Sequence, residues 1–231
     1  MKTRLLNCIV VLCILTSNGC GIGEKLESKS EGVIVYDITF PFEQPSVLLD
    51  LYPKEMHVHF KGNKMHSEIR SSYDILNSDF IIDHDERSLI QMLKNMSQRN
   101  YTTFGEKSLG QWLEQFGRFR FEPTQETLTI AGYICEKTLA HFDDPAIAPI
   151  AIYHTKGIGL FNDNWWNQFK GIEGFLFGYE IEQFGKRMRF LAREVRFEAV
   201  EDTKFNVPTN YKSISPEEMN VQLKNVVEEF M

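Results

Sequence analysis

Apolar and polar residues alternate along most of this chain, and this spacing is the feature that most limits how it can fold. In the segment Gly32–Phe40, residues Ile34, Tyr36, Ile38 and Phe40 are separated by more polar neighbours. Because side chains two positions apart lie on the same face of a strand, the pattern predicts a half-buried β-strand. Similar patterns predict further strands at Met56–Lys61, Met65–Ser71, Phe80–Asp83, Ser88–Leu93, Phe119–Ile130, Tyr133–Phe142, Ile150–Thr155, Phe175–Phe184 and Met188–Val200.

The last two of these segments are joined by the short sequence FGKR, which predicts a hairpin between two long antiparallel strands. In the second strand the apolar positions change parity, from Met188 and Phe190 to Leu191, Val195 and Phe197. An extra residue in one strand of a pair produces such a change and bends the sheet. We therefore expect a β-bulge here and a curved sheet.

Two segments have the character of helices. A short helix is expected at Asn164–Phe169. A longer helix is expected to begin after Ser215, because serine caps a helix, proline suits its first position and Glu218 lies three residues after the cap. The apolar face of the longer helix would consist of Met219, Leu223, Val226 and Phe230.

These elements predict a mainly β fold of the α+β class, in which a single curved antiparallel sheet packs against the C-terminal helix and the short helix. The chain is 42% hydrophobic and contains 18 phenylalanines, which is enough for a substantial core. The sequence contains no internal repeat and no linker within residues 32–231. We therefore expect these residues to form one domain.

The N-terminus has the features of a secretory signal. A basic region, Lys2–Arg4, precedes the apolar run Leu5–Leu15, which is too short for a membrane-spanning helix of about 20 residues. The small residues before Cys20 resemble the cleavage site of bacterial lipoproteins, in which the new N-terminal cysteine carries acyl chains. We expect residues 1–19 to be removed, Cys20 to be the lipid anchor and residues 20–31 to be a tether. The alternative is an ordinary cleaved signal in which Cys20 is incidental.

Cleavage would make the chain more acidic and would leave few cysteines. Loss of Lys2 and Arg4 would change the formal net charge from -7 to about -9. Binding to phosphate backbones requires a basic surface, so a nucleic-acid partner is not expected. Besides the anchor, Cys135 would be the one remaining cysteine, so the domain must be stabilised by burying apolar surface without a disulfide.

The segment from Ile130 to the C-terminus resembles Bacteroidota lipoproteins whose domain is similar to the LolA/LppX half-barrel. The segments that carry the resemblance are IAGYICEKTLAHF, IAIYHTKGIG, KGIEGFLFGYEIEQFGKRMRFLAREVRF and FNVPTNYKSISPEEM. It extends more weakly through GVIVYDITF and HVHFKGNKMHSEI. The resemblance implies a curved antiparallel sheet wrapped around helices.

Three polar features could carry chemistry, and a structural role is preferred for each. His57 and His59 lie two positions apart on a predicted strand, but no third ligand follows at the spacing of a metal site. The acidic segment Asp83–Glu86 lacks the glycine and the spaced acids of a calcium loop. Cys135 has apolar neighbours and is expected to be an inert core thiol. We therefore expect no metal or cofactor, and we assign no catalytic residue, because the common nucleophile, zinc-protease and phosphate-loop motifs do not occur.

Aromatic residues are concentrated in the segment GLFNDNWWNQFKGIEGFLFGY. Adjacent Trp165 and Trp166 cannot both face one side of a helix, so at least one should lie at an entrance. We interpret the segment as the lid of an apolar cavity, and the alternative is that its aromatic residues fill a solid core. The residues predicted to contact a ligand are Phe161, Trp165, Trp166, Phe169, Phe175, Phe177 and Tyr179.

The sequence favours a carrier or binding protein, namely an outer-membrane lipoprotein that faces the periplasm and holds a hydrophobic, acyl-type molecule. Gly21 follows the anchor in place of the aspartate that retains some lipoproteins at the inner membrane, which favours the outer membrane. Its partners would be the membrane, through the lipid, and a hydrophobic small molecule or an envelope protein. The alternatives are an envelope interaction protein with a solid core and no ligand and, less favoured, a hydrolase.

Overall fold

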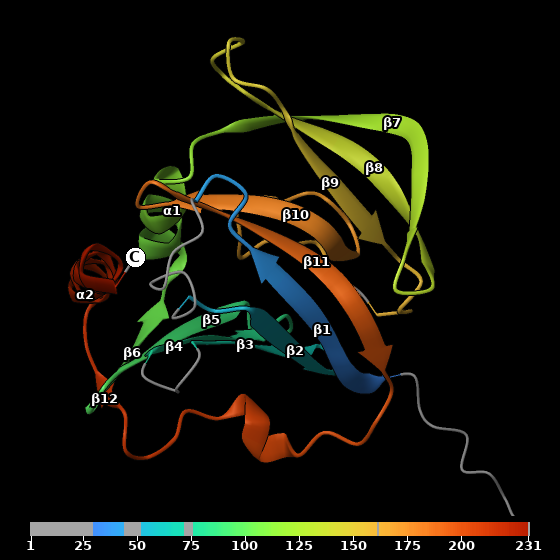
Figure 1. Ribbon diagram of the computed structural model, residues 1–231. Helices are drawn as coiled ribbons and strands as arrows, with labels where there is room; N and C mark the ends of the chain where they lie inside the picture. Colours follow the sequence, from blue (N-terminus) through green and yellow to red (C-terminus); the bar gives the residue numbers. More distant parts are fainter. Residues whose placement is uncertain (1–29, 44–51, 72–75, 161, 231) are drawn as a thin grey trace, which may run out of the picture.

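The computed structural model describes residues 30–43, 52–71, 76–160 and 162–230, and its main feature is one twelve-stranded sheet (Figure 1). The strand order is β12-β6-β5-β4-β3-β2-β1-β11-β10-β9-β8-β7, so the sheet is open, with β12 and β7 at its edges. All neighbouring strands are antiparallel except β12 and β6, which are parallel. The strands are β1 (Glu31–Thr39), β2 (Glu55–Lys61), β3 (Lys64–Arg70), β4 (Leu76–Asp83), β5 (Ser88–Asn95), β6 (Gln98–Phe104), β7 (Phe119–Ile130), β8 (Tyr133–Phe142), β9 (Ile150–Thr155), β10 (Phe175–Gln183), β11 (Lys186–Arg196) and β12 (Lys212–Ser213).

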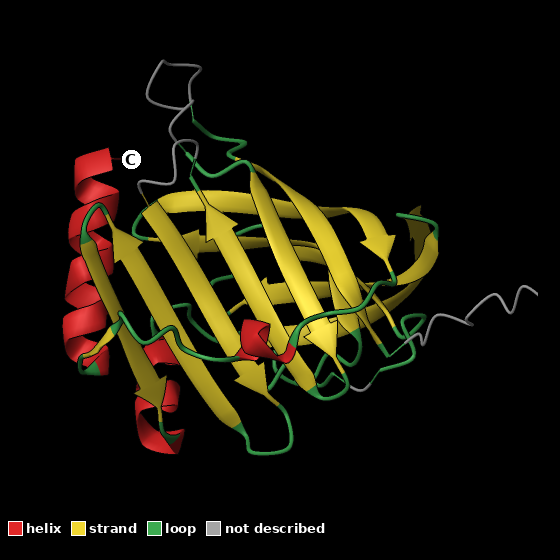
Figure 2. Cartoon of the chain, turned by 90° about the horizontal axis from the view of Figure 1, so that it is seen from below, coloured by secondary structure: helices red, strands yellow, loops and turns green. Residues whose placement is uncertain are grey.

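The sheet curls so that one part, which includes β3–β5, faces the other part, which includes β10 and β11, across a hydrophobic interior (Figures 1 and 2). Strand β2 illustrates the two faces. Met56, Val58 and Phe60 are buried in the interior core, whereas His57 and His59 alternate with them and lie on the outer face. The predicted mainly β class is confirmed, and so is the prediction that the long strands form one antiparallel sheet.

The predicted bulge in the second strand of the long hairpin is confirmed. The register between β1 and β11 shifts opposite Val35 and Tyr36, which leaves Arg193 of β11 as the extra residue. Its guanidinium binds the carboxylates of Asp37 at 2.7 Å and Glu55 at 2.9 Å on the outer face. A bulge increases the local bend of a strand, so it contributes to the curvature that encloses the interior.

The outer face of β3–β6 is covered by the segment that follows β11, and Figure 2 shows this segment crossing the strands. The segment contains a short 3-10 helix, η2 (Asp202–Phe205). Val200 and Phe205 from this segment pack on Ile81 and Met92 of the sheet. The segment therefore buries apolar side chains on the outer face of β4 and β5.

The predicted C-terminal helix is present as α2 (Pro216–Phe230). The backbone N–H of Glu218 donates to Oγ of Ser215 at 3.1 Å, and the backbone N–H of Ser215 donates to Oε2 of Glu218 at 3.1 Å. This pair of bonds is the expected capping box. The buried stripe of the helix consists of Met219, Leu223 and Val226. Phe230 belongs to the helix, but its side chain lies outside the described part of the structure.

The short helix predicted at Asn164–Phe169 is wrong, because this segment consists of turns. Asn164 adopts a φ of 51°, and its side-chain amide donates to the carbonyls of Ile172 at 2.6 Å and Gly174 at 3.0 Å. Asparagine side chains that bind the local backbone in this way compete with helix formation. The second α-helix is instead α1 (Glu106–Glu114), which lies beside α2 at one end of the molecule (Figure 1).

Candidate functional site

The interior of the curled sheet contains two adjoining cavities, of about 150 Å³ and about 90 Å³. We call them the larger chamber and the smaller chamber of one interior cavity, because several side chains border both. The residues that line both chambers are Ile69, Phe80, Trp166, Asn167, Ile181 and Phe190. Most of these are apolar, so the boundary between the two chambers is apolar as well.

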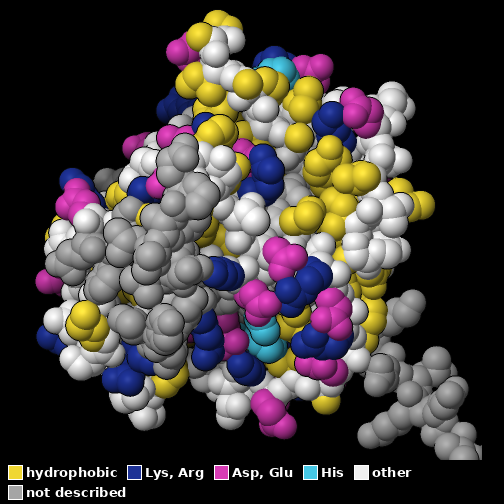
Figure 3. All heavy atoms as spheres, viewed as in Figure 1, with side chains coloured by type: hydrophobic (Ala, Val, Ile, Leu, Met, Phe, Trp, Pro, Cys, Tyr) yellow, Lys and Arg dark blue, Asp and Glu magenta, His cyan; other side chains and the backbone are white. Residues whose placement is uncertain are grey.

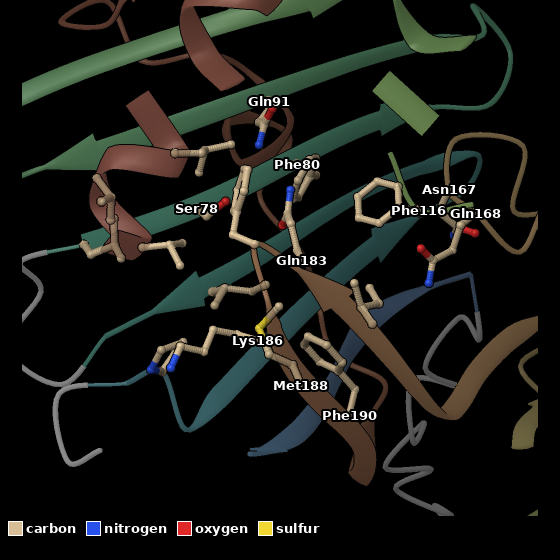
Figure 4. A pocket seen from close by; sticks show the side chains of 18 of the residues that line it. Ser78, Phe80, Gln91, Phe116, Asn167, Gln168, Gln183, Lys186, Met188 and Phe190 are labelled. Atoms are coloured by element: carbon tan, nitrogen blue, oxygen red, sulfur yellow. The ribbon is translucent and has the colours of Figure 1, made fainter. Parts of the chain in front are cut away.

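The larger chamber lies between the two parts of the sheet, and side chains from β4 and β5 face side chains from β10 and β11 across it (Figure 4). The ring of Phe80 lies 6.0 Å from the ring of Trp112 and 6.3 Å from the ring of Trp166. Phe116, just after α1, also lines the chamber. Helix α2 contributes Leu223, Val226 and Val227. Both helices and both parts of the sheet are therefore needed to form this chamber.

The smaller chamber lies against β1–β3 and the start of β10. The hydroxyl of Tyr36 donates to the carbonyl oxygen of Leu176 at 2.9 Å, and burial raises the pKa of Tyr36, so the phenol stays neutral. Burial likewise raises the pKa of Tyr179, whose ring stacks on Phe190 at 4.9 Å. None of the described residues that line this chamber carries a charge.

One basic side chain, Lys186, borders the larger chamber, and none of the other described residues that line it is charged. Nζ of Lys186 donates to Oε2 of Glu43 at 3.0 Å. This hydrogen bond raises the pKa of Lys186, so the ammonium group stays protonated and paired. The described residues of the cavity wall therefore present no unpaired charge to a ligand.

Four of the seven residues predicted to contact a ligand line the interior cavity. Trp166 borders both chambers. The smaller chamber is also lined by Phe169, Phe175 and Tyr179. Phe161 lies outside the described residues.

Trp165 and Phe177 are buried but do not line either chamber. Trp165 donates from Nε1 to Nδ1 of His84 at 3.2 Å, in the turn between β4 and β5. Phe177 packs edge-on against Tyr133 of β8, with ring centroids 5.4 Å apart. The register of β10 against β9 shifts at Phe177, so simple alternation along β10 does not place its side chain correctly.

The contributions of α1 to the site were not predicted. A helical signal is present, because Leu109, Trp112, Leu113 and Phe116 recur at spacings of three and four residues. Gly110 interrupts this pattern and lowers its helix propensity. Gln91 and Phe80 on the opposite wall follow ordinary strand alternation, and nothing in the local sequence marks them as cavity residues.

The predicted histidine pair belongs to a charged cluster on the outer face, where histidine, acidic and basic side chains gather (Figure 3). Oε2 of Glu68 lies 3.1 Å from Nε2 of His59, and Oε1 of Glu68 accepts from Lys204 and Arg70, each at 2.9 Å. Burial raises the pKa of Glu68, but the hydrogen bonds from His59 and Lys204 and the charges of His66 and Arg70 outweigh it and hold the pKa well below its usual range. Within the described residues, no group of three His, Cys, Asp or Glu side chains is placed to hold a metal ion. The cluster ties η2 to β3.

The acidic segment Asp83–Glu86 forms a turn, and Cys135 lies in the core. Oδ1 of Asp83 accepts the backbone N–H groups of Asp85 at 3.0 Å and Glu86 at 3.1 Å, which stabilises the turn between β4 and β5. Cys135 is completely buried, and burial raises the pKa of its thiol to about 11. A thiol with this pKa is a poor nucleophile at neutral pH.

No family model matches this chain, and no curated protein sequence matches it. Among solved structures, the fold is similar to PNGF-II in the P21 space group, with a TM-score of 0.54 and 14% identity over 84% of this chain and 33% of that chain. PNGF-II in the C2 space group gives a TM-score of 0.48 and 15% identity over 83% of this chain and 33% of that chain. This chain therefore spans about a third of the length of PNGF-II, and the first of these likenesses concerns the fold alone.

Proposed function

We propose that this protein is a lipid-anchored envelope carrier whose LolA/LppX-like half-barrel holds a hydrophobic, acyl-type ligand. The observation that carries the proposal is the interior cavity, which is bordered by apolar side chains from both parts of the sheet and from both α-helices. Ligand sites are typically concave and mostly apolar, with a few placed polar groups. The interior cavity has this composition.

The size of the cavity supports a ligand with one chain. An apolar cavity of about 150 Å³ accommodates a molecule the size of benzene. The larger chamber has this volume, and the smaller chamber adds about 90 Å³ beyond it. A short alkyl chain that runs from one chamber into the other matches this space better than a lipid with two chains.

The main alternative is an envelope interaction protein with a solid core. Such a protein would fill its interior, because protein cores pack as densely as organic crystals. Two adjoining chambers at the centre of the curled sheet weigh against this alternative. The hydrolase alternative gains no support from Cys135, since its buried thiol is unsuited to attack.

The proposed location depends on the N-terminal sequence. Cys20 would carry the lipid, residues 20–31 would be the tether, and the domain would face the periplasm from the outer membrane. These residues up to position 29 lie outside the described part of the chain. Among the described residues, no helix is long and apolar enough to cross a membrane.

The proposal is tested by measuring the uptake of the neutral fluorescent probe N-phenyl-1-naphthylamine by the full-length protein freed of detergent. We expect saturable binding and its loss in Ile69→Trp, because Ile69 borders both chambers and the larger side chain would obstruct the space between them. Ile134→Trp is the matched control, since Ile134 is 71% exposed and lines neither chamber. Ile181→Trp repeats the test from the opposite wall. Absence of binding by the wild type, or equal binding by wild type and both interior variants, would refute the proposal.

A further inference from the structure

Three polar atoms on residues that line the larger chamber are buried without a hydrogen-bond partner within the described protein. They are Oε1 of Gln91, Nε1 of Trp112 and Nε1 of Trp166. Gln91 is buried, with 1% of its surface exposed. Buried polar groups are almost always paired, so unpaired ones at the wall of a cavity indicate where the polar part of a ligand would bind.

The three residues surround one part of the chamber. Gln91 on β5 is the cross-strand neighbour of Phe80 on β4, and Figure 4 shows the two side chains next to each other at the cavity. The ring of Phe80 in turn lies 6.0 Å from Trp112 and 6.3 Å from Trp166. Phe80 is therefore a common neighbour of the three side chains that carry the acceptor and both donors, and all three line the same chamber.

The chemistry of these atoms restricts that polar group. An indole N–H can only donate, whereas the Oε1 atom of glutamine can only accept. A hydroxyl satisfies both, because its oxygen accepts one hydrogen bond while its hydrogen is donated in another. An ether oxygen or an ester carbonyl could accept from the tryptophans but would leave Oε1 of Gln91 unpaired.

The charge of the site restricts it further. Lys186 is the one charged residue among the described residues that line the larger chamber, and it is already bound to Glu43 at 3.0 Å. A carboxylate near Gln91 would be buried without its own counter-ion, which is strongly unfavourable. The wall therefore favours a neutral head group over an ionised fatty acid.

We propose that the interior cavity selects a neutral amphiphile with one chain, whose hydroxyl group donates to Gln91 and accepts from Trp112 or Trp166. This inference rests on the proposed carrier function and specifies its ligand class. The alkyl chain would occupy the apolar remainder of the larger chamber and the smaller chamber.

The test measures displacement of bound N-phenyl-1-naphthylamine from the full-length protein by three ligands of equal chain length. They are 1-octanol, octyl methyl ether, which lacks the donor, and octanoate at pH 7, which is charged. We expect 1-octanol to bind about tenfold more tightly than the ether. The difference in affinity between 1-octanol and octanoate should be larger. Equal or tighter binding of octanoate would overturn the inference while leaving the carrier function standing.

Variants identify the residues that recognise the hydroxyl. Gln91→Met keeps the length of the side chain and removes the acceptor, so it should weaken 1-octanol about tenfold and leave the ether unchanged. Gln183→Met is the control, because Gln183 lines the same chamber but is not buried. Trp112→Phe or Trp166→Phe, whichever removes the donor that binds the ligand oxygen, should weaken both 1-octanol and the ether. If Gln91→Met and Gln183→Met have the same effect, Gln91 does not recognise the hydroxyl; if neither the probe nor any octyl ligand binds, the carrier function itself is wrong.

Discussion

Nε1 of Trp165 lies 3.2 Å from Nδ1 of His84, and this hydrogen bond ties the loop before β10 to the turn between β4 and β5. The guanidinium of Arg87 lies 5.2 Å from the centre of the same indole ring. The next residue, Trp166, borders both chambers, and its Nε1 has no partner within the described protein. Adjacent indoles therefore have separate roles, one fixing the loop and the other forming the wall of the cavity.

Replacing each tryptophan by phenylalanine should separate these two roles. Trp165→Phe removes the hydrogen bond to His84 and should lower the free energy of unfolding by about 1 kcal/mol without changing the affinity for the fluorescent probe. Trp166→Phe breaks no hydrogen bond within the described protein, so its loss of stability should be smaller. It should alter probe affinity, because Trp166 borders both chambers. Urea unfolding and probe titration of both variants test the assignment. A loss of probe binding in Trp165→Phe alone would contradict it.

The buried stripe of α2 should contribute strongly to stability. Met219 is completely buried and packs with Leu223 and with Leu93 of β5. Met219→Ala should lower the free energy of unfolding by about 2 to 5 kcal/mol, the range for removing a large side chain from a packed core. Val221 is 58% exposed on the same helix, so Val221→Ala should change the free energy of unfolding by less than about 0.5 kcal/mol. Equal urea midpoints for the two variants would show that the stripe does not hold α2 on the sheet.

Most of the sheet could be predicted because its strands alternate regularly and end at clear turns. The bulge at Arg193 was also predictable, since it changes the parity of apolar residues within one strand. Strand β6 was missed because its sequence, QRNYTTF, has no clear apolar alternation. Its place in the sheet comes from the tight hairpin that it forms with β5 and from packing on α2, and the second of these interactions is distant in the sequence.

The candidate site was only partly predictable, for a related physical reason. The aromatic composition of the segment before β10 marks it as a candidate cavity wall, and Trp166 does border both chambers. Phe177 was misplaced because a bulge at this position breaks the alternation of β10. Gln91 and Trp112 line the same chamber only because the sheet curls and α1 packs against it, and a single sequence does not specify such an arrangement.

Replacement of the anchor tests the proposed location. Cys20→Ser cannot accept the thioether-linked lipid, so the variant should accumulate as an unprocessed or soluble precursor. Each buried methylene of an acyl chain contributes roughly 0.8 kcal/mol to membrane binding, and loss of all chains should therefore move the protein out of the membrane fraction. Fractionation and incorporation of labelled fatty acid measure this. Normal labelling and membrane partition of Cys20→Ser would contradict the lipoprotein assignment.

His154 is held as a neutral imidazole between two fixed partners. Nδ1 lies 3.0 Å from the carbonyl oxygen of Glu173, and Nε2 lies 3.0 Å from Oγ1 of Thr138. A carbonyl oxygen can only accept, so Nδ1 carries the hydrogen and Nε2 accepts from the threonine hydroxyl. Burial lowers the pKa of His154 from its ordinary value of 6.5, more than the hydrogen bond to Glu173 raises it.

This pKa shift predicts that the protein loses stability in mild acid. The unfolded chain binds a proton at His154 near pH 6.5, whereas the folded protein binds it only at lower pH, so acid favours the unfolded state. The contribution of His154 to stability should be complete above pH 6.5 and lost as the pH falls towards the folded pKa. Imidazole NMR titration should give a midpoint below 6.5, and His154→Gln should flatten the dependence of the urea midpoint on pH below pH 6.5. A titration midpoint at or above 6.5 would show that the buried imidazole is not held in the neutral form.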